Sequence, residues 1–211
     1  MCGRFVLFAS VQQLAAAGEE LLGRPVRTPY GAPPERYNIA PTQTIAVLVP
    51  AGQDNGDTAD LLPARWGLVP AWAEDYRGPV LFNARVETAA SKPSFRAAWA
   101  QSRCVVPMNG YYEWKDKQPY FVSTGELVWA AGLYSTAQEG LSATVLTTAA
   151  AGQLEWLHHR MPVFVDAAGA RAWLAGADPQ AIVPDFQIVA ANRKVGNVRN
   201  QGPELLVAQQ P

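Results

Sequence analysis

Five short apolar segments follow one another between residues 103 and 148, each separated from the next by polar residues or glycine. They are rich in β-branched and aromatic residues, which are enriched in strands, and each is too short for a typical helix. Antiparallel strands can be joined by tight turns, whereas parallel strands need a long crossover. The sequence therefore predicts an antiparallel meander with strands at residues 103–107, 111–115, 119–123, 128–134 and 143–148.

Helix and turn signals surround this region. The apolar and alanine positions of residues 11–22 fit a short amphipathic helix, which Gly23 and Pro25 would end. Segments 44–49 and 61–68 predict a hairpin around a turn at 53–57. We also expect a proline-rich loop at 24–41 and helical pieces in 83–99, broken at Pro93. Toward the C-terminus we expect a short helix or turn at 153–159, a strand at 161–165, a helix at 167–175 and an irregular tail after Asn192.

The predicted class is α+β: a single domain over residues 1–211, with a β-rich antiparallel, barrel-like core surrounded by short helices and loops. Hydrophobic residues make up 49% and charged residues 17%, which excludes a disordered or fibrous chain. The net charge of −1 argues against a globally basic nucleic-acid binder but leaves room for a local arginine patch. No apolar run approaches a membrane span, and residues 5–9 are too short for the core of a signal peptide, so we expect a soluble, cytoplasmic protein.

The two cysteines have different settings. Cys104 lies in a β-like apolar segment and predicts a buried free thiol. Removal of Met1 would leave Cys2 with a thiol and a free α-amine two carbons apart. An α-amine has a pKa of about 7.8 and is partly neutral at physiological pH, so it can form a Schiff base with an aldehyde, and the thiol can then close a thiazolidine ring. The alternative is that Cys2 is only a small residue after the start codon.

Three further positions could carry chemistry. Glu113 lies among aromatic residues, where a carboxylate is either salt-bridged or an acid/base; the alternative is an edge-strand side chain facing water. His158 and His159 are the only histidines, and one of them could project into a cleft. Two adjacent histidines and two cysteines match no usual zinc spacing, so we expect no metal.

Asn83 and Arg85 would share a face in an extended segment but not in a helix. In the extended case the amide could orient a nucleophile and the guanidinium could hold a phosphate. The alternative is an Asn that caps a helix, followed by a surface Arg.

Seven segments, taken together and in order, resemble the SOS-response-associated peptidase (SRAP) family, whose members shield abasic sites in single-stranded DNA by covalent crosslinking. They cover nearly the whole chain: Met-Cys-Gly-Arg-Phe at 1–5, Arg-Tyr-Asn-Ile-Ala-Pro at 36–41, Trp-Gly-Leu-Val-Pro-Ala-Trp at 66–72, Asn-Ala-Arg-Val-Glu-Thr at 83–88, Gly-Tyr-Tyr-Glu-Trp-Lys at 110–115, His-His-Arg-Met-Pro at 158–162 and Val-Gly-Asn-Val-Arg-Asn-Gln-Gly at 195–202.

The resemblance implies a role for each matching residue. Cys2 is the nucleophile, Asn83 positions it, and Glu113 and His158 transfer protons, with their division of labour left open. The implied DNA-binding residues are Arg4, Arg85 and Arg160 on the phosphate backbone, Asn38 beside them, and Pro41 and Trp66 at the bases.

The implied protein is a monomer without cofactor or metal, bound to single-stranded DNA that contains an abasic site and associated with the nucleoid during DNA damage. Two other functions remain open. One is a cysteine peptidase that uses Cys2, including self-removal of Met1. The other is a non-catalytic single-strand binder.

Overall fold

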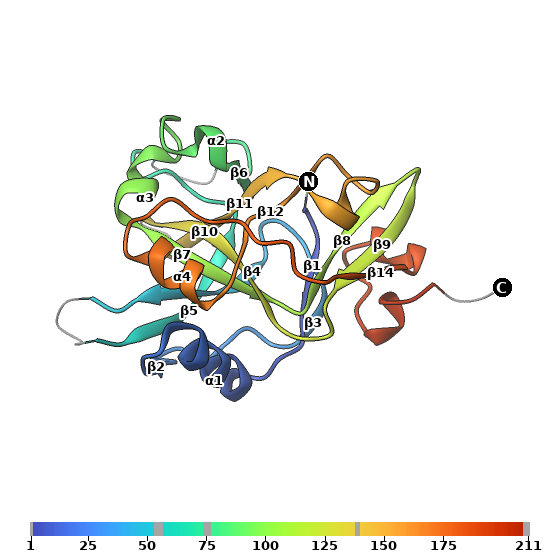
Figure 1. Cartoon of the computed structure of the whole chain (residues 1–211), viewed down its shortest axis with the longest axis horizontal. Coiled ribbons are helices and arrows are strands. Elements are labelled where there is room, and N and C mark those ends of the chain that lie inside the picture. Colours follow the sequence, from blue (N-terminus) through green and yellow to red (C-terminus); the bar gives the residue numbers. More distant parts are fainter. Residues whose placement is uncertain (1, 53–56, 74–76, 138–139, 209–211) are drawn as a thin grey trace.

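Five strands close into a barrel at the centre of the molecule (Figure 1). The computed structural model describes residues 2–52, 57–73, 77–137 and 140–208. Around the barrel β4 pairs with β5, β5 with β11, β11 with β10, β10 with β7, and β7 with β4 again; only β5 and β11 are parallel. The expected α+β class with a barrel-like core is therefore confirmed. The five strands are β4 (Thr44–Pro50), β5 (Ala59–Trp66), β7 (Arg103–Met108), β10 (Val128–Ala137) and β11 (Gly140–Ala149).

A second sheet packs beside the barrel and holds the N-terminal strand. Its order is β14, β9, β8, β1, β3, so β1 lies between β8 and β3 and is antiparallel to both. In Figure 1 this sheet occupies the right-hand part of the molecule. Its strands are β1 (Phe5–Leu7), β3 (Arg36–Ile39), β8 (Gly110–Lys115), β9 (Gln118–Ser123) and β14 (Gln187–Ala190).

The meander prediction is wrong in its pairing, although all five strands exist. β7 stays in the barrel while β8 and β9 form a hairpin in the second sheet. The chain changes sheets at Gly110, where a Cβ atom would lie 2.6 Å from the ring of Phe121. Only glycine fits that close approach.

The helix at residues 11–22 is confirmed as α1 (Val11–Leu22). Ser10 and Gln13 form a capping box at its start, and Gly23 ends it in the left-handed conformation at φ 68°. Arg171 of α4 (Ala167–Leu174) donates to the Leu21 carbonyl oxygen at 2.9 Å, which ties the two helices together.

Residues 83–99 differ from the expected helical pieces. Residues 83–85 form a strand, β6 (Asn83–Arg85), which pairs in parallel with β11. Two short helices follow, α2 (Val86–Ala89) and α3 (Arg96–Gln101). β11 has room for β6 because its contact with β5 ends at Ala143, which leaves backbone groups beyond that point to be paired.

The remaining elements are short. Residues 160–165 form two strands instead of one, and Val163 lies between them. The Val163 N–H donates to the Leu146 carbonyl oxygen on β11, whereas the Val163 carbonyl oxygen accepts from the Ala131 N–H on β10, so the chain passes from one neighbouring strand to the other at this residue. The proline-rich loop contains two strands, and four residues of the expected turn at 53–57 lie outside the described residues. These elements are β2 (Val26–Arg27), β12 (Arg160–Pro162), β13 (Phe164–Val165) and the 3₁₀ helices η2 (Gly152–Leu154), η3 (Arg193–Gly196) and η4 (Pro203–Leu205).

Cys104 is a buried free thiol, as predicted. Over the described ranges, no helix is both long enough and apolar enough to span a membrane.

Candidate active site

Cys2 is held at the start of the second sheet. β1 pairs on both edges, and the Tyr112 backbone N–H donates to the Arg4 carbonyl oxygen at 2.8 Å, which extends the ladder toward Cys2. The Asn83 side-chain amide donates to the Cys2 carbonyl oxygen at 2.7 Å. Cys2 is fully buried. A backbone ladder and a side-chain amide therefore fix this residue together.

β6 sets the direction of Asn83. It runs alongside β11 with Asn83 opposite Val145 and Arg85 opposite Thr147, so the backbone is extended. In this conformation Asn83 and Arg85 share a face, which was one of the two sequence hypotheses. Asn83 is half-buried against Cys2, whereas Arg85 is exposed.

Glu113 lies close enough to act electrostatically on the Cys2 thiol. Burial and, to a smaller extent, the negative charge of Glu113 raise the pKa of that thiol to about 12, although a hydrogen bond from the Arg4 backbone opposes both. The Tyr111 hydroxyl has a pKa well above its usual value because of burial and the charges of Cys2 and Glu113. Glu113 is itself buried, with 5% of its surface exposed. The thiol is therefore neutral at physiological pH, and it adjoins a carboxylate.

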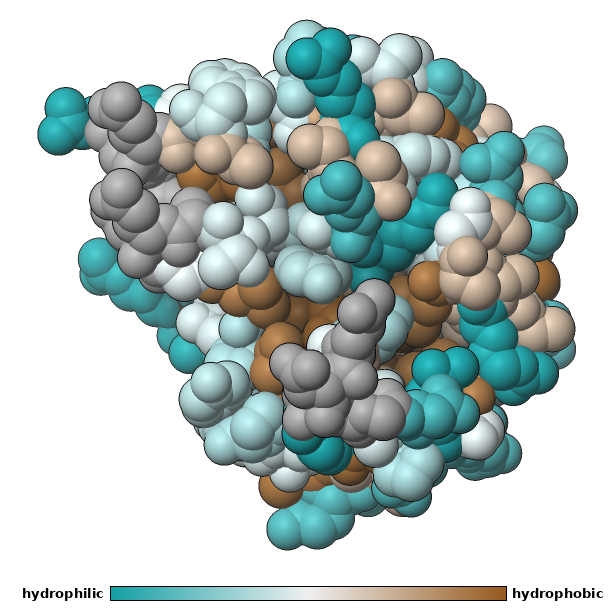
Figure 2. Space-filling model, turned by 90° about the vertical axis from the view of Figure 1, so that its left-hand side faces the viewer, coloured by the Kyte–Doolittle hydropathy of each residue, from teal (hydrophilic) through white to brown (hydrophobic). Residues whose placement is uncertain are grey.

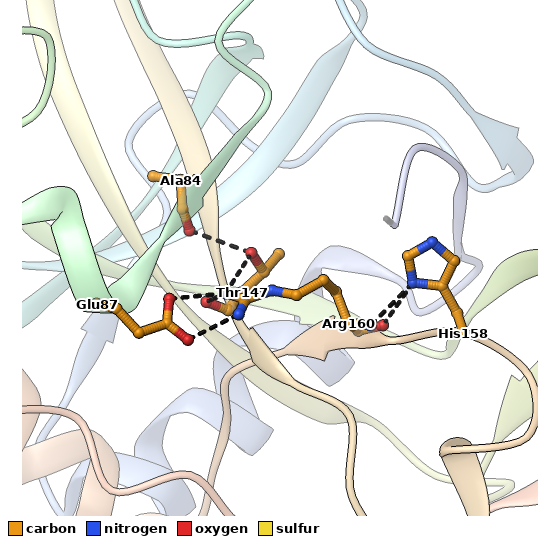
Figure 3. Close-up of polar contacts among 5 residues, drawn as sticks. All are labelled: Ala84, Glu87, Thr147, His158 and Arg160. Atoms are coloured by element: carbon orange, nitrogen blue, oxygen red, sulfur yellow. Dashed lines mark hydrogen bonds and ion pairs between the residues drawn. The ribbon is translucent and has the colours of Figure 1, made fainter.

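His158 has a defined orientation. The Arg160 backbone N–H donates to its Nδ1 at 2.9 Å, so a neutral ring carries its proton on Nε2 (Figure 3). The ring is half-buried and points toward the start of the N-terminal ribbon, which lies beside β12 in Figure 1 as well. His159 is exposed and stacks on His158 with 4.2 Å between centroids. The electrostatic interaction with His158 is the largest cause that lowers the pKa of His159.

Arg160 is held by an acidic partner that the sequence analysis did not identify. Its Nη1 and Nη2 atoms lie 2.7 and 2.9 Å from the two Glu87 carboxylate oxygens, and Nη2 also donates to Thr147 (Figure 3). Only 10% of the Arg160 side chain is exposed, compared with 48% for Glu87. The signal for Glu87 was its place in the sequence segment 83–88, two residues after Arg85 and at the start of α2.

Asn38 and Arg4 stabilise the protein interior. Asn38 is fully buried and donates through Nδ2 to the carbonyl oxygens of Val195, Asn197 and Asn200, at 3.2, 3.0 and 3.0 Å. Arg4 donates to Asn38 Oδ1 at 2.9 Å and to the Val195 carbonyl oxygen at 2.7 Å. The prediction that Asn38 contacts DNA is wrong, because its side chain has no exposed surface. Its amide instead holds the 195–200 segment against β3.

Trp66 is also in the core. It is fully buried, donates to the Phe82 carbonyl oxygen at 2.8 Å and packs edge-on against Phe5. A buried indole cannot stack on a base, so the prediction for Trp66 is wrong. The exposed tryptophan of the same loop is Trp72, with 69% of its surface open, whereas Pro41 is only partly exposed.

Trp72 borders a cavity of about 440 Å³ next to the start of α3. Arg65 contributes a guanidinium to its wall, and the other lining residues are mostly apolar. Figure 2 looks onto the side of the molecule that carries α3, where hydrophobic residues gather in a central hollow between hydrophilic ones. The apolar lining residues are Leu68, Val69, Pro70, Trp72, Ala73, Pro79, Val80 and Leu81.

No group of three or more metal-ligating side chains is found within the described ranges of the chain. The Asn83 amide and the Glu113 carboxyl group lie next to Cys2, and the His158 imidazole points toward the same end of the chain. Such a set can position a nucleophile and move protons.

Residues 1–197 match the family described as SOS response associated peptidase (SRAP). The chain belongs to this family. Among its relatives, the abasic site processing protein YoqW of Bacillus subtilis is 31% identical over 98% of this chain and 99% of its own length. The abasic site processing protein YedK of Escherichia coli is 32% identical over 98% and 99%.

The fold also recurs in solved structures. A protein from Bacteroides thetaiotaomicron superposes with a TM-score of 0.79 at 20% identity, covering 99% of this chain and 100% of its own. That likeness concerns the fold alone.

Proposed function

We propose that this chain recognises abasic sites in single-stranded DNA and joins them covalently through Cys2 after Met1 has been removed. The names of its relatives as abasic site processing proteins support the substrate class. One observation carries the chemistry. The Cys2 carbonyl is held by Asn83 at 2.7 Å, while its buried thiol adjoins Glu113.

The reaction has two bond-forming steps. The Cys2 α-amine attacks the aldehyde carbon of the ring-opened deoxyribose, and loss of one water gives a C=N bond. The thiol sulfur then attacks the same carbon, and the thiol proton ends on the nitrogen. The product is a five-membered thiazolidine, formed without an oxidant or reductant.

The raised thiol pKa of about 12 supports one order of these steps. Very little thiolate exists at neutral pH, whereas an α-amine with a pKa of about 7.8 is partly neutral. The amine therefore attacks first, and the thiol needs a base when the ring closes. In this proposal Glu113 accepts the thiol proton, and the Nε2–H of His158 donates to the sugar oxygen during ring opening.

Arg85 and Trp72 are the contacts that we assign to the DNA strand. Arg85 is exposed on the same face as Asn83, so a phosphate bound there would lie beside the nucleophile. Trp72 offers an exposed indole next to an apolar cavity, and base stacking on aromatic side chains is common in single-strand binding. In this proposal Arg4 and Arg160 act mainly on the protein itself.

Cysteine peptidase activity is the competing function. A peptidase needs donors for the carbonyl of the bond that it cuts. Asn83 instead binds the carbonyl of Cys2 itself, so it anchors the nucleophilic residue and does not act on the bond that joins Met1 to Cys2. This contact favours the aldehyde reaction.

Intact mass spectrometry tests the proposal. The protein is mixed with an oligonucleotide that contains uracil, before and after uracil removal. We expect an adduct of the protein without Met1, only with the abasic strand. Cys2→Ser keeps the amine and loses the thiol, so its adduct should appear only after borohydride reduction of the Schiff base. A variant with an untrimmed residue before Cys2 should form none. An adduct from that variant, or none from protein with a free Cys2 amine, would refute the mechanism.

A further inference from the structure

An aromatic and cationic cluster outside the reaction centre borders it on one side. It consists of Lys115, Tyr120 and Trp156. Lys115 lies two residues beyond Glu113 on β8, so both side chains leave the same face of the strand, roughly 7 Å apart. Tyr120 on β9 is directly opposite Glu113, and Trp156 comes two residues before His158. One member of the cluster is therefore the cross-strand neighbour of Glu113, and another lies two residues from His158 along the chain.

The three side chains contact one another. The Tyr120 and Trp156 rings meet at right angles with 5.1 Å between centroids. The Lys115 ammonium lies 5.0 Å from the centroid of the Trp156 ring and donates to the Trp156 carbonyl oxygen. An ammonium has three N–H donors, so others remain for a ligand.

Trp156 is open to solvent although its partners hold it in place. About 46% of its surface is exposed. Exposed apolar side chains that occur singly are common, but this one is fixed by a cation and a second ring next to a reaction centre. A held, exposed indole is preorganised for a flat partner, because little rotamer entropy remains to be lost on binding.

We propose that Lys115, Tyr120 and Trp156 bind the nucleotide next to the abasic site in the same strand. Trp156 stacks on its base and Lys115 pairs with its phosphate. The proposal rests on the proposed function, because it takes the abasic sugar to lie at Cys2. A nucleotide combines a flat π surface with a negative charge, and this cluster offers the complement of both. Lys115 and Tyr120 lie on the same face of the second sheet as Glu113. With the abasic sugar at Cys2, the next nucleotide of the bound DNA strand would lie over this face.

The first test compares oligonucleotides that differ only beside the abasic site. One set has adenine on both sides, and two others replace the 5′ or the 3′ neighbour by a baseless tetrahydrofuran unit. Adduct formation is measured against DNA concentration. We expect removal of the base on one side to raise the half-saturating concentration of the wild type about fivefold or more, with the saturating rate unchanged.

On adenine-flanked DNA, Trp156→Ala should raise the half-saturating concentration by the same factor. For this variant, removing the neighbouring base should cause no additional increase. Trp156→Phe should retain most of the wild-type affinity. Tyr30→Ala is the matched control, because Tyr30 is an exposed aromatic residue between β2 and β3, with 78% of its surface open. Equal melting temperatures would show that the variants are folded.

Lys115→Gln tests the charge separately. It should reduce the slope of log affinity against log salt by about 0.7, the value for one phosphate contact on a single strand. If Trp156→Ala matches the wild type, or if it still responds to the missing base as the wild type does, the cluster does not bind a base and the proposal is wrong. If the wild type forms no adduct with any abasic strand, the proposed function fails instead.

Discussion

Replacing Glu87 by Gln would remove the negative charge that faces Arg160 and keep the size of the side chain. Two charge-assisted hydrogen bonds at 2.7 and 2.9 Å join the two side chains. A buried pair of this kind would contribute several kcal/mol, but Glu87 is 48% exposed and solvent screens it. Gln also keeps one acceptor oxygen. We therefore expect Glu87→Gln to lower the free energy of unfolding by about 1 to 2 kcal/mol.

Thermal unfolding at pH 7.5 would measure this loss as a fall in Tm of roughly 2 to 8 °C. The pH dependence gives a second check. The hydrogen bond from Arg160 lowers the pKa of Glu87. Stability from a carboxyl group with a lowered pKa is present above its unfolded pKa and is lost as the pH falls through the folded one. The difference between wild type and variant should therefore shrink below about pH 4.

Glu20→Gln serves as the control, because Glu20 is exposed on α1. It should leave Tm nearly unchanged. A Glu87→Gln protein that melts with the wild type at pH 7.5 would show that the pair contributes nothing to stability, and a deficit that stays constant into acid would show that the loss does not come from the Glu87 charge.

Three other substitutions and one chemical probe test the remaining contacts. Asn83→Ala should slow crosslinking about 10- to 100-fold with little change in Tm, because Cys2 loses its side-chain anchor; an unchanged single-turnover rate would exclude that role. Asn38→Ala should lower the free energy of unfolding, measured in urea, by about 2 to 4 kcal/mol, because three carbonyl oxygens lose their donor. A loss below about 0.5 kcal/mol would argue against this structural role of Asn38. Arg85→Gln should reduce the slope of log affinity against log salt concentration for single-stranded DNA by about 0.7 without changing Tm. An unaltered slope would show that Arg85 does not contact a phosphate. Cys2 and Cys104 should react slowly with iodoacetamide at pH 8 until urea is added, because burial raises both thiol pKa values; rapid labelling of the native protein would contradict this.

Local signals in the sequence predicted the elements whose formation depends on near neighbours. The β4–β5 hairpin follows from two apolar segments around a turn, and α1 follows from its apolar and alanine positions and its stop at Gly23. The same signals could not predict which strands pair. β1 joins β8 through Phe5 and Tyr111, residues far apart in the sequence, and no local pattern marks that choice.

The candidate site was predictable only as a set of residue types. The sequence identified Cys2, Asn83 and Glu113 as separate candidates, and the structure brings them together. It could not show that Asn38 and Trp66 are buried, because a polar or aromatic residue in a loop motif looks the same whether its side chain faces the core or the solvent. Burial depends on segments that arrive later in the chain, here residues 195–200 for Asn38.

The place of β1 between β3 and β8 links reactivity to the order of protein synthesis. β1 leaves the ribosome long before β8, Asn83 and His158 have been made, so Cys2 waits without its partners while the nascent chain grows. The Cys2 thiol is enclosed only when β1 pairs with β8 and Asn83 reaches the Cys2 carbonyl. If the proposed function holds, capture of an abasic-site aldehyde with help from Asn83 and His158 would require that the whole chain has been made and folded.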